Sequence, residues 1–145
     1  MPVKPDNEKT YIFPNDLDSL SEVRKEVRSF LGEKCPDLTK GRIVFCLDEV
    51  ITNVIEHGFP EPKESEILLT MQNRSKEWKF IINDKGISFD PTKLKSETWK
   101  ELYESGADGG FGLRSVKKIM TIKYKRLKSP PGNKLTLIYS KEADE

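Results

Sequence analysis

The stretch from Ile43 to His57, IVFCLDEVITNVIEH, is the most informative in the chain. Its apolar residues recur every three or four positions, which predicts one long helix. Glu49, Asn53 and His57 are four residues apart, so on that helix they form a single stripe. Asn53 and His57 fall at the edge of the apolar arc, where a buried polar group without a partner costs ~1–3 kcal/mol. The stripe therefore predicts polar side chains that turn inward and meet partners. For His57 alone, an equally good interpretation is a helix C-cap ahead of a left-handed Gly58.

A second motif, Asp84-Lys85-Gly86, follows an apolar run from Trp78 to Ile82 that has the composition and length of a strand. Alone, an aspartate and a glycine at a strand end make an ordinary turn. The sequence Phe89-Asp90-Pro91 just beyond the turn, and the polar stripe before it, favour a binding site instead.

A third motif, GGFG at 109–112, leads into apolar residues at helical spacing from Leu113 onward. A glycine-rich loop that opens a helix presents free backbone N–H groups and the positive end of the helix dipole, which together attract anions. It is not a Walker loop, because no Lys-Ser/Thr pair follows the last glycine. It is not a dinucleotide fingerprint either, because Ser115 stands where a third glycine belongs. We expect a phosphate site of another kind.

Taken in order, E-x-x-x-N-x-x-x-H, D-x-G-x-x-F-D-P and G-G-x-G-L resemble the N, G1 and G2 boxes of the GHKL ATPase superfamily. The greatest similarity is to the small anti-sigma-factor serine/threonine kinases of bacterial stress and sporulation switches. It extends over nearly the whole chain, from Tyr11 to Tyr139. The resemblance implies a Bergerat-type ATP-binding fold, an α+β two-layer sandwich in which three helices cover one face of a mixed, mostly antiparallel sheet.

The resemblance also implies ATP and Mg²⁺ as ligands and assigns roles to residues. Asp84 would accept a hydrogen bond from the adenine amino group, and Asn53 would offer its amide oxygen to Mg²⁺. Glu49 would take the proton of the attacking hydroxyl as the catalytic base. The implied cofactor-binding residues are Asn53, His57, Asp84, Gly86, Phe89, Gly109, Gly110, Gly112 and Leu113.

In the resembled kinases the phosphate acceptor is a serine of an anti-sigma-antagonist protein of the STAS type, and the kinase sequesters a sigma factor. The same resemblance implies a homodimer. A basic position on the first helix contacts both partners in those kinases, and Arg24 is its best match by distance to Phe30. An equally good interpretation of Arg24 is a solvated helix face that it shares with Lys25 and Arg28.

One departure from the family concerns turnover. Close relatives often carry a basic residue just before the glycine run, yet 101–108 holds no Lys or Arg. Phosphoryl transfer would then need another cation, which Lys93, Lys95, Lys100 or Arg114 could supply. The first alternative is a nucleotide-dependent binding module with little or no catalysis. A histidine-kinase-like catalytic domain is a weaker alternative, because no histidine-bearing dimerisation helix precedes the site.

The chain has 145 residues, 35% of them apolar and 34% charged, which is the size of one domain, 1–145. The polar segment 92–108 corresponds to the ATP lid of the resembled family. The chain has no long apolar run and no signal-peptide core, which predicts a cytoplasmic protein without a membrane span. Cys35 and Cys46 lack metal-ligand spacing. The basic run 114–128 has no recognition motif beside it, so we expect no nucleic-acid partner.

The same patterns predict the secondary structure. Ser19 and Glu22 have the spacing of a capping box at the start of a first helix. We expect helices near 17–31 and 39–57 and a glycine-led helix after 108, strands near 11–13, 66–73, 77–83, 121–127 and 134–140, and a turn at 130–133.

Overall fold

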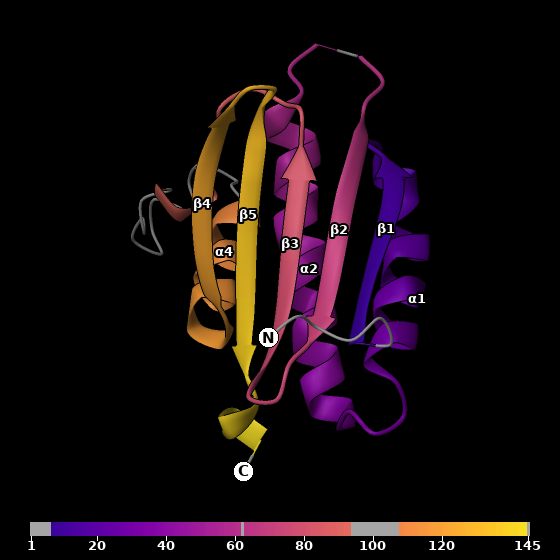
Figure 1. The fold of residues 1–145 in the computed structure, drawn as a ribbon. Helices are drawn as coiled ribbons and strands as arrows, with labels where there is room; N and C mark the ends of the chain where they lie inside the picture. Colours follow the sequence, from indigo (N-terminus) through magenta and orange to yellow (C-terminus); the bar gives the residue numbers. More distant parts are fainter. Residues whose placement is uncertain (1–6, 62, 94–107, 145) are drawn as a thin grey trace.

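The computed structural model describes residues 7–61, 63–93 and 108–144. In these ranges the chain forms two layers, a five-stranded sheet in the order β1-β2-β3-β5-β4 and three α-helices that cover one face of it (Figure 1). The strands are β1 Glu8–Pro14, β2 Glu66–Asn73, β3 Glu77–Asp84, β4 Thr121–Lys128 and β5 Pro131–Ser140. The α-helices are α1 Leu20–Leu31, α2 Asp37–Gly58 and α4 Asp108–Ile119, and short 3₁₀ helices span Leu17–Ser19, Pro91–Lys93 and Lys141–Asp144.

The expected α+β two-layer sandwich is confirmed, with a sheet that is more uniform than predicted. Each of the four strand pairs in the described ranges is antiparallel, so the described sheet is not mixed. The reason is the position of β5. The strands β3 and β4 both run antiparallel to β5, which lies between them and keeps these two like-directed strands from pairing with each other.

The first helix begins later than its apolar pattern suggests. Asp16 accepts hydrogen bonds at Oδ1 from the backbone N of Ser19 at 3.0 Å and from its hydroxyl at 2.9 Å. This cap closes a 3₁₀ turn at Leu17–Ser19, and α1 starts only after it. The side chain of Ser19 makes no capping bond to α1, so the predicted capping box is wrong.

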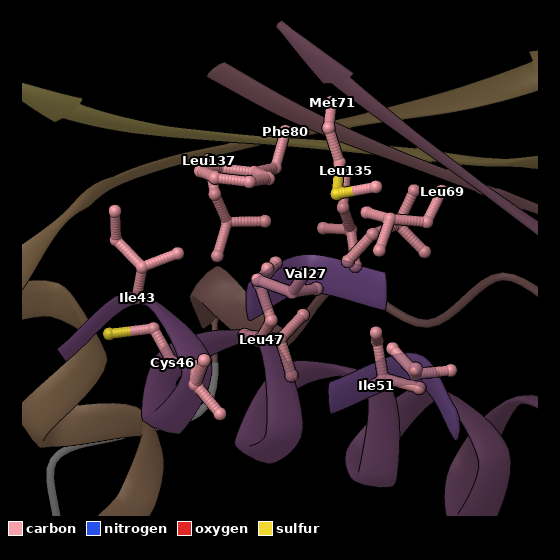
Figure 2. Close-up of a cluster of buried hydrophobic side chains, with 14 of the residues drawn as sticks. Val27, Ile43, Cys46, Leu47, Ile51, Leu69, Met71, Phe80, Leu135 and Leu137 are labelled. Atoms are coloured by element: carbon pink, nitrogen blue, oxygen red, sulfur yellow. The ribbon is translucent and has the colours of Figure 1, made fainter. Parts of the chain in front are cut away.

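The core lies between the sheet and the helices. Figure 2 shows Val27 of α1 and Leu47 and Ile51 of α2 directed toward the sheet residues Phe80 and Leu137. All five are at most 1% exposed. The helix α2 is buried along most of its length because it packs against the sheet on one side and against α1 and α4 on the others.

Strand alternation extends this core to the end of β3. Trp78, Phe80, Ile82 and Asp84 are buried in turn, with less buried residues between them. Successive side chains on a strand point to opposite faces of the sheet, so Asp84 lies on the helix-covered face with the apolar residues. The sequence thus places a carboxylate on the core face of the sheet, which requires hydrogen-bond partners for it.

The cysteines lie inside the fold. Both cysteines are buried and neither forms a disulfide in the described ranges. Burial, and to a lesser extent the charge of Glu49, raises the pKa of Cys46 to about 12. In the described ranges, no three His, Cys, Asp or Glu side chains gather in a way that could hold a metal ion. None of the helices in the described part of the chain has the length and apolar character that a membrane crossing requires.

Candidate functional site

Three elements end close together at one end of the molecule. The arrowhead of β3, the last turn of α2 and the turn between β4 and β5 all lie there (Figure 1). We call residues 84–87, which begin at the last residue of β3, the Asp84 turn. This turn is held by backbone contacts to α2 and by side-chain contacts to β4 and β5.

Asp84 is 5% exposed and accepts two hydrogen bonds on the same oxygen. The backbone N of Gly86 donates to Oδ1 at 2.8 Å, and Nδ2 of Asn133 donates to Oδ1 at 2.9 Å. Among the described residues nothing donates to Oδ2, which remains a free acceptor. Burial raises the pKa of Asp84, while the hydrogen bonds from Asn133 and Gly86 and the charge of Arg126 oppose that rise.

Asn133 is a functional candidate that the sequence analysis missed. It is 2% exposed and lies directly opposite Asp84 in the β3–β5 register. The predicted turn at 130–133 is present but shorter, at 129–130, because β5 begins at Pro131 and Asn133 belongs to the strand. A signal was present: counting back by two from the apolar Leu135 and Leu137 puts Asn133 on the buried face.

The Asp84 turn is joined to the end of α2. The backbone N of Ile87 donates to the carbonyl oxygen of Gly58 at 2.9 Å. A Cβ placed on Gly86 would lie 2.5 Å from the same oxygen and 3.0 Å from Oδ1 of Asp84. Gly86 is therefore required by the close approach of the turn to the helix, a contact within the protein itself.

Asn53 occupies the middle of the polar stripe on α2 and is 3% exposed, as the stripe predicts. Its Nδ2 donates to the backbone oxygen of Glu49 at 2.7 Å. Because a carbonyl can only accept, this bond fixes the amide nitrogen against its own helix. The amide oxygen Oδ1 accepts no hydrogen bond from any described residue and is available to a ligand.

Glu49 lies one turn earlier on α2 and is half-buried. Burial raises the pKa of Glu49, and the neighbouring charges of Asp48 and Glu56 add to the rise. A carboxylate whose pKa is raised in this way is a better proton acceptor than an ordinary surface glutamate.

His57, the last member of the stripe, does not turn inward. It is exposed, and its ring contacts that of Phe89 with 5.2 Å between the centroids. The alternative with a left-handed Gly58 is also wrong, because Gly32 is the glycine with a positive φ in the described ranges and α2 continues through Gly58. The helix wheel failed here because His57 lies in the final turn of α2, where less of the chain covers the helix.

The glycine motif lies within a helix. The helix α4 begins at Asp108, so 109–112 forms its first turn and not a loop before it. Leu113 is 3% exposed and packs in the core together with Val116. The predicted lid, 92–108, falls mostly on 94–107, outside the described residues, as do Lys95 and Lys100.

The start of that segment is tied to the site. The side chain of Asp90 accepts hydrogen bonds from the backbone N of Thr92 at 2.9 Å and from its hydroxyl. Nζ of Lys117, on α4, donates to the backbone oxygen of Thr92 at 2.9 Å. The stretch that leads from Phe89 into 94–107 is thus fastened to α4.

Arg24 is not on a free helix face. Its NH1 lies 2.6 Å from Oδ1 of Asp48 on α2, and its side chain is 42% exposed. Lys25 and Arg28 are exposed, as the solvated-face interpretation requires. Arg24 links α1 to the residue that precedes Glu49.

A groove of about 1160 Å³ is lined by Phe59, Glu61, residues 63–66 and residues 14–16 at the end of β1. It takes in Lys85 but neither Asp84 nor Asn53. The candidate site is therefore defined by Asp84 and Asn53, two buried side chains that each carry a free acceptor oxygen. It does not coincide with the groove.

Comparisons with known proteins identify the family of this chain. The chain is 32% identical over 78 residues to the serine-protein kinase RsbW of Oceanobacillus iheyensis, a match that covers 51% of this chain and 49% of that protein. It thus spans about half the length of this curated relative. The solved histidine kinase AdeS of Acinetobacter baumannii superposes with a TM-score of 0.48 at 16% identity, over 91% of this chain and 67% of the other. The sequence profile of the histidine kinase-like ATPase domain matches residues 13–139, and the chain belongs to that family.

Proposed function

We propose that this chain binds ATP with Mg²⁺ and transfers the γ-phosphate to a serine of an anti-sigma-antagonist protein of the STAS type, thereby switching the sequestration of a sigma factor. The observation that carries the proposal is the buried carboxylate of Asp84, whose Oδ1 is held by two donors while Oδ2 accepts none from the described residues. Membership of the ATPase family and the match to a serine-protein kinase support it.

The base is selected by Asp84. An ionised carboxylate only accepts hydrogen bonds, so its Oδ2 suits the 6-amino group of adenine and repels the 6-carbonyl of guanine. Gly86 keeps the turn in place against α2. His57 and Phe89, already in contact, complete the residues that we assign to the base side of the nucleotide.

The phosphate side is assigned to α2 and α4. Asn53 offers Oδ1, an oxygen ligand of the type that Mg²⁺ accepts beside phosphate oxygens and water. The ion, when bound, supplies positive charge against the phosphates. The backbone N–H groups of Gly109, Gly110 and Gly112, in the first turn of α4, are proposed to hold phosphate oxygens, with Leu113 anchoring that turn in the core.

The chemical step is assigned to Glu49. The serine oxygen attacks the γ-phosphorus, the bond from that phosphorus to the bridging oxygen breaks, and ADP leaves. Glu49 takes the hydroxyl proton, and its raised pKa suits that role. We assign 92–108 as the lid of a single domain, 1–145.

The partner surface is assigned to α1. Arg24 would contact the antagonist and the sigma factor, which requires it to leave or share its ion pair with Asp48. We propose a homodimer that acts in the cytoplasm. A nucleotide-dependent binding module with little catalysis is the second candidate, and the lack of Lys or Arg at 101–108 favours it.

Calorimetry with ATP and GTP tests the binding proposal. Wild-type protein should prefer ATP, and Asp84→Asn should lose at least about tenfold in ATP affinity with its fold intact, because a hydrogen bond to a charged acceptor contributes ~1.5–3 kcal/mol. Equal affinity for both nucleotides would remove the adenine assignment.

Phosphoryl transfer is tested with labelled ATP, Mg²⁺ and lysate of the source organism. One small protein should gain serine phosphate. Glu49→Gln should abolish transfer and keep nucleotide binding, whereas Asn53→Ala should weaken Mg²⁺-dependent binding as well. Nucleotide binding without any labelled acceptor would favour the binding module, and wild-type transfer by Glu49→Gln would remove the base assignment.

A further inference from the structure

Asn133 uses both hydrogens of its amide on the Asp84 turn. Nδ2 donates to Oδ1 of Asp84 at 2.9 Å and to the backbone oxygen of Ile87 at 2.8 Å. These two acceptors lie at the two ends of the turn, so one side chain spans it. The side chain is 2% exposed and comes from β5, which is paired with β3 in register at this position.

Two residues of β4 fix the orientation of this amide. The hydroxyl of Tyr124 donates to Oδ1 of Asn133 at 2.5 Å, and NH1 of Arg126 approaches the same oxygen at 3.3 Å. Because Oδ1 is occupied by donors, Nδ2 must face Asp84. NH1 of Arg126 also donates to the backbone oxygen of Gly86 at 2.8 Å, so β4 holds the turn both directly and through Asn133.

We propose that Asn133 is a positioning residue for base selection, which keeps Oδ1 of Asp84 engaged in the turn and leaves Oδ2 as the acceptor that meets the base. Tyr124 and Arg126 act through it. This proposal rests on the proposed ATP-binding function and extends it to three residues outside the three sequence motifs.

The consequence for selectivity follows from the chemistry of a carboxyl group. An ionised carboxylate accepts only, whereas a protonated one also donates and would tolerate the carbonyl of guanine. Donors to Oδ1 favour the ionised form. Without Asn133 the orientation of the carboxyl group is also less restricted, because only the hydrogen bond from the backbone N of Gly86 still holds Oδ1. Both effects reduce discrimination at the 6-position of the purine.

The test compares three nucleotides by calorimetry: ATP, GTP and purine riboside triphosphate, which lacks the 6-amino group. For Asn133→Ala we expect ATP affinity to fall about tenfold, with the affinity for purine riboside triphosphate unchanged within twofold. Asn73→Ala is the matched control, because it removes a side-chain amide that is hydrogen-bonded to Lys141 at the opposite end of the sheet. It should leave all three affinities unchanged.

An equal loss for ATP and for purine riboside triphosphate would overturn the proposal, because it would show a structural role alone. So would an Asn133→Ala variant in which neither of the two affinities changes. If Asn133→Ala does not fold, Tyr124→Phe replaces it. This change removes one hydroxyl, and we expect about a threefold loss for ATP alone. An unchanged ratio in Tyr124→Phe would then overturn the proposal.

Measurements on the wild-type protein distinguish a failure of the ATP-binding proposal from a failure of the positioning role of Asn133. Equal wild-type affinity for ATP and purine riboside triphosphate would remove the adenine assignment itself, and this inference with it. Wild-type preference for ATP that survives in the Asn133→Ala variant would remove the positioning role of Asn133 and leave the ATP-binding proposal standing.

Discussion

Gly86→Ala should destabilise the protein by about 2–4 kcal/mol. The new Cβ would lie 2.5 Å from the carbonyl oxygen of Gly58, whereas carbon and oxygen normally approach to about 3.3 Å. The turn and the helix must therefore separate by roughly 0.8 Å. The hydrogen bond from Ile87 to Gly58, now 2.9 Å, would be lost at a cost of about 1 kcal/mol. Strain from overpacking adds about 1–3 kcal/mol.

Gly58→Ala is the matched control, because it adds the same methyl group on the other side of the same contact. Its Cβ would meet Cγ1 of Val54 at 4.0 Å, an ordinary distance. Alanine also favours a helix over glycine by up to about 1 kcal/mol, so this variant should be at least as stable as wild type. Denaturant and thermal unfolding measure both, with a fall in Tm of about 6–14 °C expected for Gly86→Ala. Substitutions at the protein surface usually change the free energy of unfolding by no more than about 0.5 kcal/mol. A Gly86→Ala protein whose stability lies within that range of wild type would refute the steric contact between Gly86 and Gly58.

Three further outcomes are expected. Glu49→Gln should stabilise the protein at pH 7.5, because the pKa of Glu49 is raised in the folded state and the ionised side chain therefore costs stability above that pKa. Near pH 4 the glutamate is largely protonated in both states, so the gain should vanish. Denaturant unfolding at the two pH values measures the difference. Arg24→Ala should cost less than about 1 kcal/mol, because its ion pair with Asp48 is partly solvated, and a double-mutant cycle with Asp48→Asn measures the coupling. Cys46, with its pKa raised to about 12, should not react with an aromatic disulfide reagent at pH 8 until the protein unfolds; a fast native reaction would contradict its burial.

Local patterns predicted the elements of the fold well. The strand β2 matches its expected range at 66–73, and α2 extends the predicted helix by two residues at its start and one at its end. Strand and helix periodicity depend on neighbouring residues only, so they can be recognised from the sequence. The start of α1 was missed because Asp16, and not Ser19, caps the turn. Which of these two candidate caps is used depends on the path of the chain before them.

The candidate site was predicted in part. The polar stripe identified Asn53 as a buried amide, and the strand end identified Asp84 as a candidate binding residue, which the structure shows to be buried. The hydrogen bond from Asn133 to Asp84 was not foreseen, because it depends on the register between β3 and β5. The two residues lie 49 positions apart in the sequence. Pairing over such a separation is a tertiary property, and a pattern of prolines and glycine at 130–132 pointed to a turn.

The hydrogen bond from the backbone N of Ile87 to the carbonyl oxygen of Gly58 fixes the spacing between α2 and the Asp84 turn. Asn53 and Gly58 belong to one continuous helix, about 7.5 Å apart along its axis, and Gly58 is bonded by backbone atoms to the turn that carries Asp84. The backbone positions that carry the two free oxygens are therefore held at a fixed spacing. Under the proposed function, a nucleotide that reaches both oxygens must match that span between its base and its phosphate-bound cation. Nucleotides with a lengthened or shortened link between base and phosphates should be rejected even when each end is chemically correct.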